Sequence, residues 1–312
     1  MKNYILNYYQ NFKCSADKCK HTCCAGWKMN IDKKSLSAYK NDTSNFSSRL
    51  KSGINFKKSC FKSDKVGCCA FLNANGLCEI IINLGEESLC QVCSDHPRFR
   101  SFFDDRMETG LGFCCEEATK IILSYGDKIE PILVGDDKEK SALDFNQKNI
   151  LDFRQKAIDI LQNRTVSIND RIKDLLTLSR AQVSMQEFRK IVKTFLSLER
   201  LNKSWTKRLK VIKNKPFVAE VDQSLSLYCE QFLVNSLYRH LSDAEDTMWV
   251  RARTIACVFA WWVIESIYNN ETANGEIFSV LSDVVREYSA EVEYSQKNLD
   301  KLFSFAYKFI KV

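Results

Sequence analysis

Proline, glycine and histidine are scarce in this sequence, and each scarcity excludes a class of protein. Three prolines and ten glycines among 312 residues are too few for a collagen-like or low-complexity chain. The three histidines, His21, His96 and His240, form no paired motif, which a two-Cys two-His zinc finger needs. The formal net charge of +7 is a small excess, so the composition gives no reason to expect a nucleic-acid partner.

Long apolar runs are also missing. The longest, residues 255–264, would rise about 15 Å as a helix, which is half of a bilayer's hydrocarbon core. We interpret it as a buried core helix. Near the N-terminus, Asn3, Asn7 and Gln10 interrupt any apolar segment of the kind found in a secretory signal. We therefore expect a cytoplasmic protein with no membrane partner.

Cysteine is the residue present in excess. Twelve of the 14 cysteines precede residue 125, and only Cys229 and Cys257 follow it. Because cytosolic thiols are kept reduced, so many cysteines indicate metal binding or thiol chemistry rather than disulfides. The spacing Cys90-x2-Cys93 is typical of a zinc knuckle or an iron–sulfur loop, and the other spacings are unusual. All-sulfur ligation suits either zinc or an iron–sulfur cluster, and both remain open at this point.

Two other thiol-based functions are disfavoured by the same spacings. Cys19-x3-Cys23 begins a radical S-adenosylmethionine motif, but Gly26 stands where the third cysteine belongs. A thioredoxin-like role for Cys90 and Cys93 needs a βαβ context, which the surrounding sequence lacks.

The composition divides the chain into a cysteine-rich region, 1–125, and a region almost free of helix breakers, 126–312. The second region has apolar positions at helical spacing and no strand-like alternation of useful length. Helices are predicted over residues 150–161, 188–201, 224–241, 249–268, 277–288 and 298–310. Residues 136–140 are predicted as a linker and 202–215 as a basic connector. The expected fold is mainly α, with an irregular cysteine-rich, metal-binding N-terminal region packed on a C-terminal helical bundle.

Four strings in the first 120 residues resemble the flagellin lysine-N-methylase family, which shares its cysteine core with small zinc- or iron-chelating cysteine-cluster proteins. They are FKCSADKCKHTCCAGWKMNID (12–32), CAFLNANGLCEI (69–80), LGEESLCQVCSDHPR (84–98) and ETGLGFCCEEA (108–118). The helical remainder shares only weak motifs with that family. The sequence departs from the family pattern at Ala70 and Glu116, where proline is usual, and at His96, where tyrosine is usual.

The resemblance implies nine metal ligands: Cys14, Cys19, Cys23, Cys24, Cys69, Cys78, Cys90, Cys93 and Cys115. It leaves Cys60, Cys68, Cys114, Cys229 and Cys257 as extras and gives His96 no ligand role. Trp27 is expected in the core. Arg98 and Glu108 also fit the pattern, either as structural ion-pairing residues or in a substrate role.

Family members transfer methyl groups from S-adenosylmethionine to lysine side chains of flagellin and carry a metal centre. The resemblance therefore implies an S-adenosylmethionine-dependent protein-lysine N-methyltransferase that acts on flagellin or another protein. Its implied metal is a [4Fe-4S] cluster, with zinc as the alternative. No residue is identified as a catalytic base, a cofactor-binding group or a lysine pocket. Tyr8, Tyr9, Asp32 and Glu117 lie near the cysteines, and we interpret them as surface or capping residues.

Two other functions fit the same cysteines. One is a non-catalytic zinc- or iron-binding module, or a metal-delivery protein, whose helices dock a partner. The other is a different metal-dependent enzyme that modifies peptides. Nine thiolates exceed the four of one cluster, so a second metal or free structural thiols must account for the rest. The sequence allows an oligomer but does not specify one.

Overall fold

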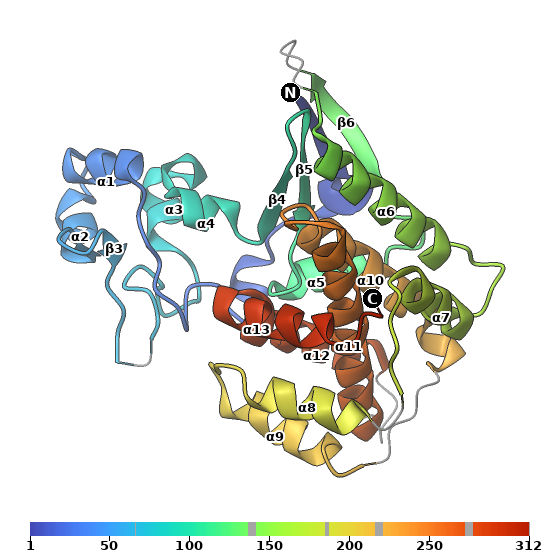
Figure 1. Cartoon of the computed structure of the whole chain (residues 1–312). Helices are drawn as coiled ribbons and strands as arrows, with labels where there is room; N and C mark the ends of the chain where they lie inside the picture. The colour runs from blue at the N-terminus through green and yellow to red at the C-terminus, as the bar shows by residue number, and fades with distance from the viewer. Residues whose placement is uncertain (66, 137–141, 185–186, 216–220, 272–276, 312) are drawn as a thin grey trace. The chain divides into compact units, whose positions relative to one another are not determined.

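The structure is a computed structural model that describes residues 1–65, 67–136, 142–184, 187–215, 221–271 and 277–311. It divides into two compact units. Unit 1 comprises Met1–Phe12, Phe99–Cys114 and Ala118–Val312, and unit 2 comprises Lys13–Arg98 and Cys115–Glu117. The chain thus begins in unit 1, forms most of unit 2 as one long insertion, returns to unit 1 at Phe99, and adds the short segment Cys115–Glu117 to unit 2. Helix dominates the described residues, which confirms the expected mainly α composition (Figure 1).

A small mixed sheet opens unit 1. Its strands are β1 (Lys2–Leu6), β4 (Arg98–Phe102), β5 (Arg106–Leu111) and β6 (Pro131–Asp136), in the order β4-β5-β1-β6. Strand β1 runs parallel to β5 and antiparallel to β6, with Tyr4 opposite Glu108 on one side and Leu133 on the other. Strand β6 corrects the expectation that residues 126–312 contain no strand. The predicted linker 136–140 falls outside the described residues, except for Asp136, which ends β6.

The helices of unit 1 surround one central helix, α11 (Thr247–Glu271). It packs against α6 (Phe145–Leu161), α7 (Ile168–Leu178), α9 (Lys203–Ile212), α10 (Ser226–His240), α12 (Ile277–Tyr288) and α13 (Gln296–Tyr307). Ten consecutive residues of α11, Ile255 to Ile264, are buried, so this helix has no solvent face in its middle. A helix that is apolar all round belongs in a core, as the sequence indicates. No helix among the described residues is long and apolar enough to cross a membrane.

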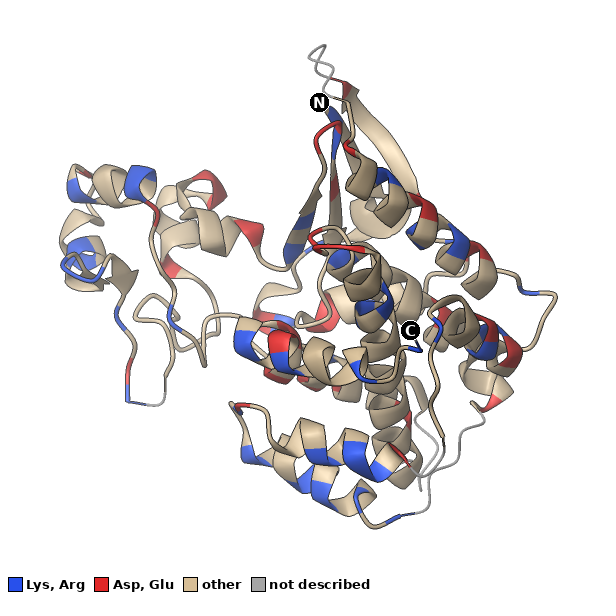
Figure 2. Cartoon of the chain, viewed as in Figure 1, with Lys and Arg blue, Asp and Glu red and all other residues tan. Residues whose placement is uncertain are grey.

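The periodic apolar segments of the second region are confirmed as helices α6, α8 (Phe188–Leu196), α10, α11, α12 and α13. Helix α7 was not predicted, and residues 202–215, predicted as a basic connector, contain α9 instead. Helix α9 buries only Trp205, Leu209 and Ile212, and lysines and arginines occupy much of the rest of its surface. With α8 it forms the most basic part of the described chain (Figure 2). Because α9 has so few apolar positions, its sequence shows little helical periodicity.

A π-helical turn, Ser289–Glu293, follows α12 and turns a carboxylate into the core of unit 1. Glu293 accepts a hydrogen bond from the Ser289 hydroxyl and lies 2.9 Å from Nε2 of His240 and 3.3 Å from Nη1 of Arg239. These charges hold the pKa of Glu293 down at about 2, although burial opposes ionisation. Burial lowers the pKa of His240, so the neutral imidazole is the form suited to this site.

Unit 2 is built from short elements around a small core. Its helices are α1 (Lys33–Lys40), α2 (Ser47–Ser52), α3 (Glu79–Leu84) and α4 (Gln91–Asp95), and a two-stranded ribbon pairs β2 (Ile54–Asn55) with β3 (Cys60–Phe61). Helix α5 (Glu116–Leu123) starts in unit 2 and continues into unit 1. Phe71 lies in the core against Phe61, with ring centroids 5.3 Å apart, and so close to Gly53 that a side chain there would collide with its ring. The short helices and long loops confirm an irregular cysteine-rich N-terminal region.

Candidate metal centre

All nine cysteines that the resemblance implies as ligands lie in unit 2. Every cysteine in the chain is a free thiol, so no disulfide withdraws any of them from metal binding. They come from four stretches of sequence: the loop before α1, the turn between β3 and α3, the start of α4, and the residue preceding α5. Folding therefore collects thiols that are far apart along the chain into one unit of fewer than a hundred residues.

Five of the nine, which we call the core thiols, belong to the hydrophobic cluster of unit 2. They are Cys24, Cys69, Cys78, Cys90 and Cys93. Cys90 is completely buried and Cys69 is 7% exposed, while the other three are partly buried and pack against the same cluster. Met29, Phe61 and Phe71 are among its apolar members. The largest concentration of thiols in the chain is thus inside the part of unit 2 that holds its fold together.

Backbone hydrogen bonds between distant segments fix the core thiols. The Cys69 amide donates to the Cys24 carbonyl at 2.7 Å, which ties the first cysteine group to the second. The Cys93 amide donates to the Cys90 carbonyl at 3.0 Å, which closes the first turn of α4. This turn also brings the Cys90 and Cys93 thiols within hydrogen-bonding reach of each other. Paired sulfurs on one helical turn are how a short Cys-x2-Cys spacing presents two ligands to a metal.

The Asp32 side chain accepts hydrogen bonds from the first turns of both α1 and α4, the helix that begins beside Cys90. One carboxylate oxygen accepts from the Ser35 amide at the start of α1, and the other accepts from the Gln91 amide at the start of α4, both at 2.9 Å. These bonds lower the pKa of Asp32 to about 2. Asp32 is therefore the N-cap of α1 and also satisfies the first turn of α4, directly after Cys90. Its interpretation as a capping residue is confirmed.

The remaining four, Cys14, Cys19, Cys23 and Cys115, are called the surface thiols. Cys14 and Cys23 are exposed, and Cys19 and Cys115 are partly buried. The Lys20 amide donates to the Glu116 carboxylate at 3.0 Å, which ties the loop that carries Cys19 to the residue after Cys115. Glu116 stands where the related family has proline, and nothing in the sequence pointed to this contact. Trp27 lies beside this loop and is 37% exposed, which corrects its expected place in the core; its indole donates to the Cys23 carbonyl at 2.8 Å.

The thiols affect one another's protonation. A hydrogen bond from the Cys23 thiol lowers the pKa of Cys24 to about 7 and raises that of Cys23. Cys90 and Cys93 behave in the same way, with Cys90 the more acidic partner. Burial raises the pKa of Cys69 to about 11. Each close pair thus contains one thiol with a lowered pKa and one with a raised pKa, and thiolate is the form of cysteine that binds metals.

The extra cysteines lie elsewhere. Cys229 and Cys257 are buried in α10 and α11 of unit 1, where desolvation raises the pKa of both. Cys114 lies in unit 1, within reach of Tyr294 and Arg239. Cys60 and Cys68 are in unit 2, and neither belongs to the core cluster. Cys60, Cys229 and Cys257 are buried, and buried thiols act as small hydrophobic side chains.

The donor set fits a thiophilic metal centre by its chemistry. It consists of free sulfur ligands that gather in one unit, and zinc and iron–sulfur clusters are the groups that such ligands bind. Within the described residues, no three His, Cys, Asp or Glu side chains surround a common point as ligands do. The nine thiols therefore lie in one unit, but no three of them are arranged around a common point. The nine cysteines stay a prediction as ligands, and so does the identity of the metal.

Glu108, Arg98 and Tyr8, which are polar residues near the cysteines in sequence, contact other residues of their own unit. Oε1 and Oε2 of Glu108 each lie 2.7 Å from a different nitrogen of Arg154, and both side chains are buried. The Arg98 guanidinium donates to the backbone carbonyls of Ser94 and His96. Tyr8 is completely buried, which corrects its interpretation as a surface or capping residue. Its hydroxyl donates to Asn235 and accepts from the Leu111 amide at 3.2 Å. These contacts connect elements within each unit and account for Glu108 and Arg98 as structural residues.

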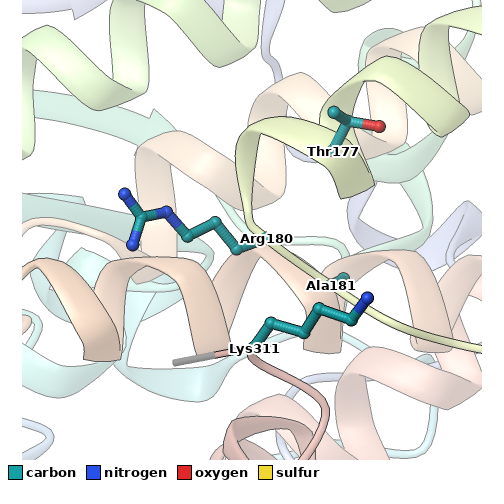
Figure 3. Close-up of a pocket in the computed structure, with 4 residues that line it drawn as sticks. All are labelled: Thr177, Arg180, Ala181 and Lys311. Carbon is teal, nitrogen blue, oxygen red and sulfur yellow. The ribbon is translucent and has the colours of Figure 1, made fainter.

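One open pocket of about 430 Å³ occurs in the described part of unit 1, lined by Thr177, Arg180, Ala181 and Lys311 (Figure 3). It lies where α7 ends, and the Lys311 amide donates to the Arg180 carbonyl at 2.9 Å. Cations next to a helix C-terminus complement the negative end of the helix dipole, which explains these charges without a ligand. The Thr177 hydroxyl donates to the Lys173 carbonyl. The lining offers no thiol or carboxylate for metal binding or acid–base chemistry.

Comparison with known proteins gives partial similarity to lysine methylases. No family model and no solved structure matches the chain. The lysine-N-methylases of Salmonella choleraesuis (strain SC-B67) and Salmonella typhimurium (strain LT2) are each 28% identical to it over 128 residues, which is 38% of this chain and 32% of each relative. The flagellar biosynthetic protein FliU of Salmonella muenchen is 27% identical over 128 residues, 76% of its length. The match thus spans about a third of the lysine-N-methylases, and over this stretch it confirms the resemblance.

Proposed function

We propose that the chain is an S-adenosylmethionine-dependent protein-lysine N-methyltransferase whose unit 2 binds a thiolate-ligated metal centre. The 128-residue similarity to lysine-N-methylases carries this proposal. The collection of free thiols in unit 2 supports the metal part of it. The name of the flagellar biosynthetic relative supports flagellin as the first substrate to test. A [4Fe-4S] cluster is the expected centre, and zinc is the alternative.

Methyl transfer to lysine sets chemical requirements. The ε-amine must be neutral when its nitrogen attacks the methyl carbon of the sulfonium. The new N–C bond forms as the S–C bond breaks, S-adenosylhomocysteine leaves, and the amine gives up a proton to a base or water. A lysine is neutral near pH 7 only when desolvation or a nearby positive charge lowers its pKa. The site must also hold the amine in line with the methyl group.

A metal centre in unit 2 would supply structural cross-linking and, if one metal position stays open, a place for polar groups of the cofactor. The chain's own residues prepare this unit for the metal. Asp32 fixes the start of α4 so that Cys90 and Cys93 share one turn, and the contact between Cys24 and Cys69 joins the first two cysteine groups. In each close pair the thiol with the lowered pKa, Cys24 or Cys90, is the easier of the two to deprotonate on binding.

The test is methyl transfer by the anaerobically purified full chain. It is incubated with flagellin and S-adenosylmethionine labelled in the methyl group, beside a Cys93→Ser variant and a Cys257→Ser variant as the matched control. We expect label on flagellin lysines with the native chain and with Cys257→Ser, and little or none with Cys93→Ser. Absence of label with a metal-replete chain would contradict the proposal.

A metal-binding module without catalysis is the second candidate. It is favoured by the position of the core thiols inside a hydrophobic cluster, which is where a purely structural metal site would lie. Calorimetry with S-adenosylmethionine separates the two candidates, because only the methylase is expected to bind this cofactor. Mass spectrometry of a co-purified peptide tests for a different peptide-modifying enzyme, which would change the peptide mass by something other than added methyl groups.

A further inference from the structure

The positive charge of the chain is concentrated in residues 187–215, which form α8, α9 and the turn between them and which we call the basic hairpin. This segment carries ten of the chain's 46 lysines and arginines but only two of its 39 acidic residues. Its formal charge is therefore +8, whereas the rest of the chain sums to −1. A solvated protein surface usually mixes charges of both signs. The small excess of the whole chain is thus a strong local charge on two helices of unit 1 that pack against each other (Figure 2).

The inner side of the basic hairpin is fixed to unit 1 and is electrically compensated. Arg208 of α9 lies 2.9 Å from carboxylate oxygens of both Glu271 and Asp283, and it also pairs with Glu287. In the turn, the Glu291 carboxylate accepts two backbone amide hydrogen bonds, at 2.7 and 2.8 Å. Contacts of this kind hold the hairpin in place, so its exposed side is presented by a rigid support.

Five cations on the exposed side, which we call the basic face, have no such compensation. They are Arg189, Lys193, Lys203, Lys207 and Lys210. No ion pair among the described residues includes any of the five. The two acids of the hairpin are engaged elsewhere, since Glu187 pairs with Lys190 at 3.0 Å and Glu199 pairs with Lys297. The charge of the basic face is therefore open to a partner.

Like charges on this face repeat at helical spacing. Lys207 is four residues after Lys203 and three before Lys210, and Lys193 is four residues after Arg189. Side chains at these spacings are neighbours on a helix, and like charges there destabilise it. No contact among the described residues offsets this repulsion. A partner that brings carboxylates to the face would relieve it and would bind more tightly for that reason.

Exposed apolar side chains accompany the charges. Val211, four residues after Lys207, is 51% exposed, and Leu201 in the turn is 58% exposed. Protein interfaces combine apolar contacts with complementary charges in this way. Single-stranded nucleic acids, by contrast, are held by stacking on exposed aromatic rings. The aromatic side chains of the basic hairpin are all buried: Phe188, Phe195 and Trp205. The face therefore fits an acidic protein surface better than a nucleic acid.

We propose that the basic face, together with Leu201 and Val211, is a docking surface for an acidic region of a protein partner. In the proposed methyltransferase this partner is the protein substrate, and that assignment rests on the proposed function. A lysine is itself cationic, so the basic face repels the residue to be methylated and meets a different, acidic part of the same substrate. Complementary charge speeds such an encounter and selects among partners.

Binding of a fluorescent peptide tests the surface without methyl transfer. The probe is a glutamate-rich peptide with interspersed leucines, and fluorescence anisotropy measures its affinity for the full chain. The test variant carries Lys203→Glu, Lys207→Glu and Lys210→Glu. The matched control reverses three exposed lysines of α6 and α7, Lys148→Glu, Lys156→Glu and Lys173→Glu. We expect the test variant to lower the affinity by about tenfold or more and the control to change it by less than about threefold.

Both variants are expected to keep the helical circular dichroism of the native chain, because all six lysines are exposed. If charge reversal unfolds the hairpin, the neutral variant Lys203→Gln, Lys207→Gln, Lys210→Gln takes its place and is expected to weaken binding in the same direction. Absence of peptide binding by the native chain, or equal affinities of the test and control variants, would overturn the inference. Tighter binding of a duplex DNA oligonucleotide than of the peptide would overturn it in favour of a nucleic-acid partner.

Methyl transfer tests the assignment of the partner to the substrate. We expect the test variant to raise KM for flagellin and to leave kcat unchanged, because the basic face takes no part in the chemical step. An unchanged KM in a variant that no longer binds the peptide would overturn this assignment. Because peptide binding is measured without S-adenosylmethionine, binding without methylation by the native chain would refute the proposed enzyme and leave the docking surface standing.

Discussion

The buried ion pair between Glu108 and Arg154 allows a sharp test of the structural role assigned to Glu108. Both carboxylate oxygens lie 2.7 Å from guanidinium nitrogens, and the Glu108 side chain is only 2% exposed. The guanidinium carbon of Arg154 also lies 4.6 Å from the ring centroid of Tyr238 and 5.4 Å from that of Phe103. Glu108→Gln removes the negative charge and leaves this guanidinium buried without a counter-charge.

The expected cost follows from that geometry. Removing one partner of a buried ion pair lowers the free energy of unfolding by about 3–5 kcal/mol. With a urea m value of about 3 kcal/mol per M, the unfolding midpoint of unit 1 falls by about 1–2 M. The double variant Glu108→Gln, Arg154→Met removes both charges, and we expect it to recover most of the loss because apolar replacement of a buried pair is often neutral. Asp152→Asn, an exposed acid on the same helix as Arg154, is the control and is expected to change the free energy by less than about 0.5 kcal/mol.

Urea unfolding followed by circular dichroism measures these midpoints, and methyl transfer per folded molecule is measured at low urea. We expect Glu108→Gln to lower stability while each folded molecule keeps its activity. An unchanged midpoint, or a double variant no more stable than the single one, would refute the reasoning. A stable Glu108→Gln chain without activity would instead give Glu108 the substrate role that the resemblance left open.

Three further predictions concern acid stability, capping and the extra thiols. The folded-state pKa of His240 is lowered, so the stability that the neutral imidazole contributes is present above its unfolded pKa of about 6.5 and is lost as the pH falls. In the wild-type chain the urea midpoint is therefore expected to fall between pH 7 and 5, and His240→Asn is expected to reduce that fall. Asp32→Ala removes acceptors from the first turns of α1 and α4, and we expect thermal unfolding of unit 2 to show a loss of about 2 kcal/mol, about 1 for each helix start. Cys257→Ser is expected to keep the full metal content because this thiol is buried in α11 of unit 1, and a metal loss as large as that of Cys93→Ser would contradict the assignment.

The sequence predicts those parts of the fold in which one periodic pattern dominates. Helices α11 and α12 follow directly from their apolar positions, and α12 has the predicted bounds. Strand β6 was not predicted because its sequence does not alternate between apolar and polar residues. Ile132, Leu133 and Val134 follow one another and are all exposed at the edge of the sheet. Pairing between β1 and β5 depends on contacts between residues about a hundred positions apart, which local patterns do not encode.

The candidate site shows the same limit. The resemblance names the nine cysteines, but spacing does not reveal which of them enter the core. Cys23 and Cys24 are adjacent in the chain and fall in different groups, because the Cys24 carbonyl pairs with the distant Cys69 amide while Cys23 stays exposed. The exposure of Trp27 was not predicted either, because it depends on a specific contact: the indole donates a hydrogen bond to the Cys23 carbonyl instead of entering the apolar cluster.

The most direct test of the central claim is the metal and sulfide content of the anaerobically purified chain, with its visible spectrum. A thiolate-ligated [4Fe-4S] centre predicts about four iron and four sulfide per chain and broad absorption at about 400 nm. Zinc without sulfide would replace the expected cluster with the zinc alternative and favour a structural role for the thiols. A folded chain that binds neither metal would contradict the account.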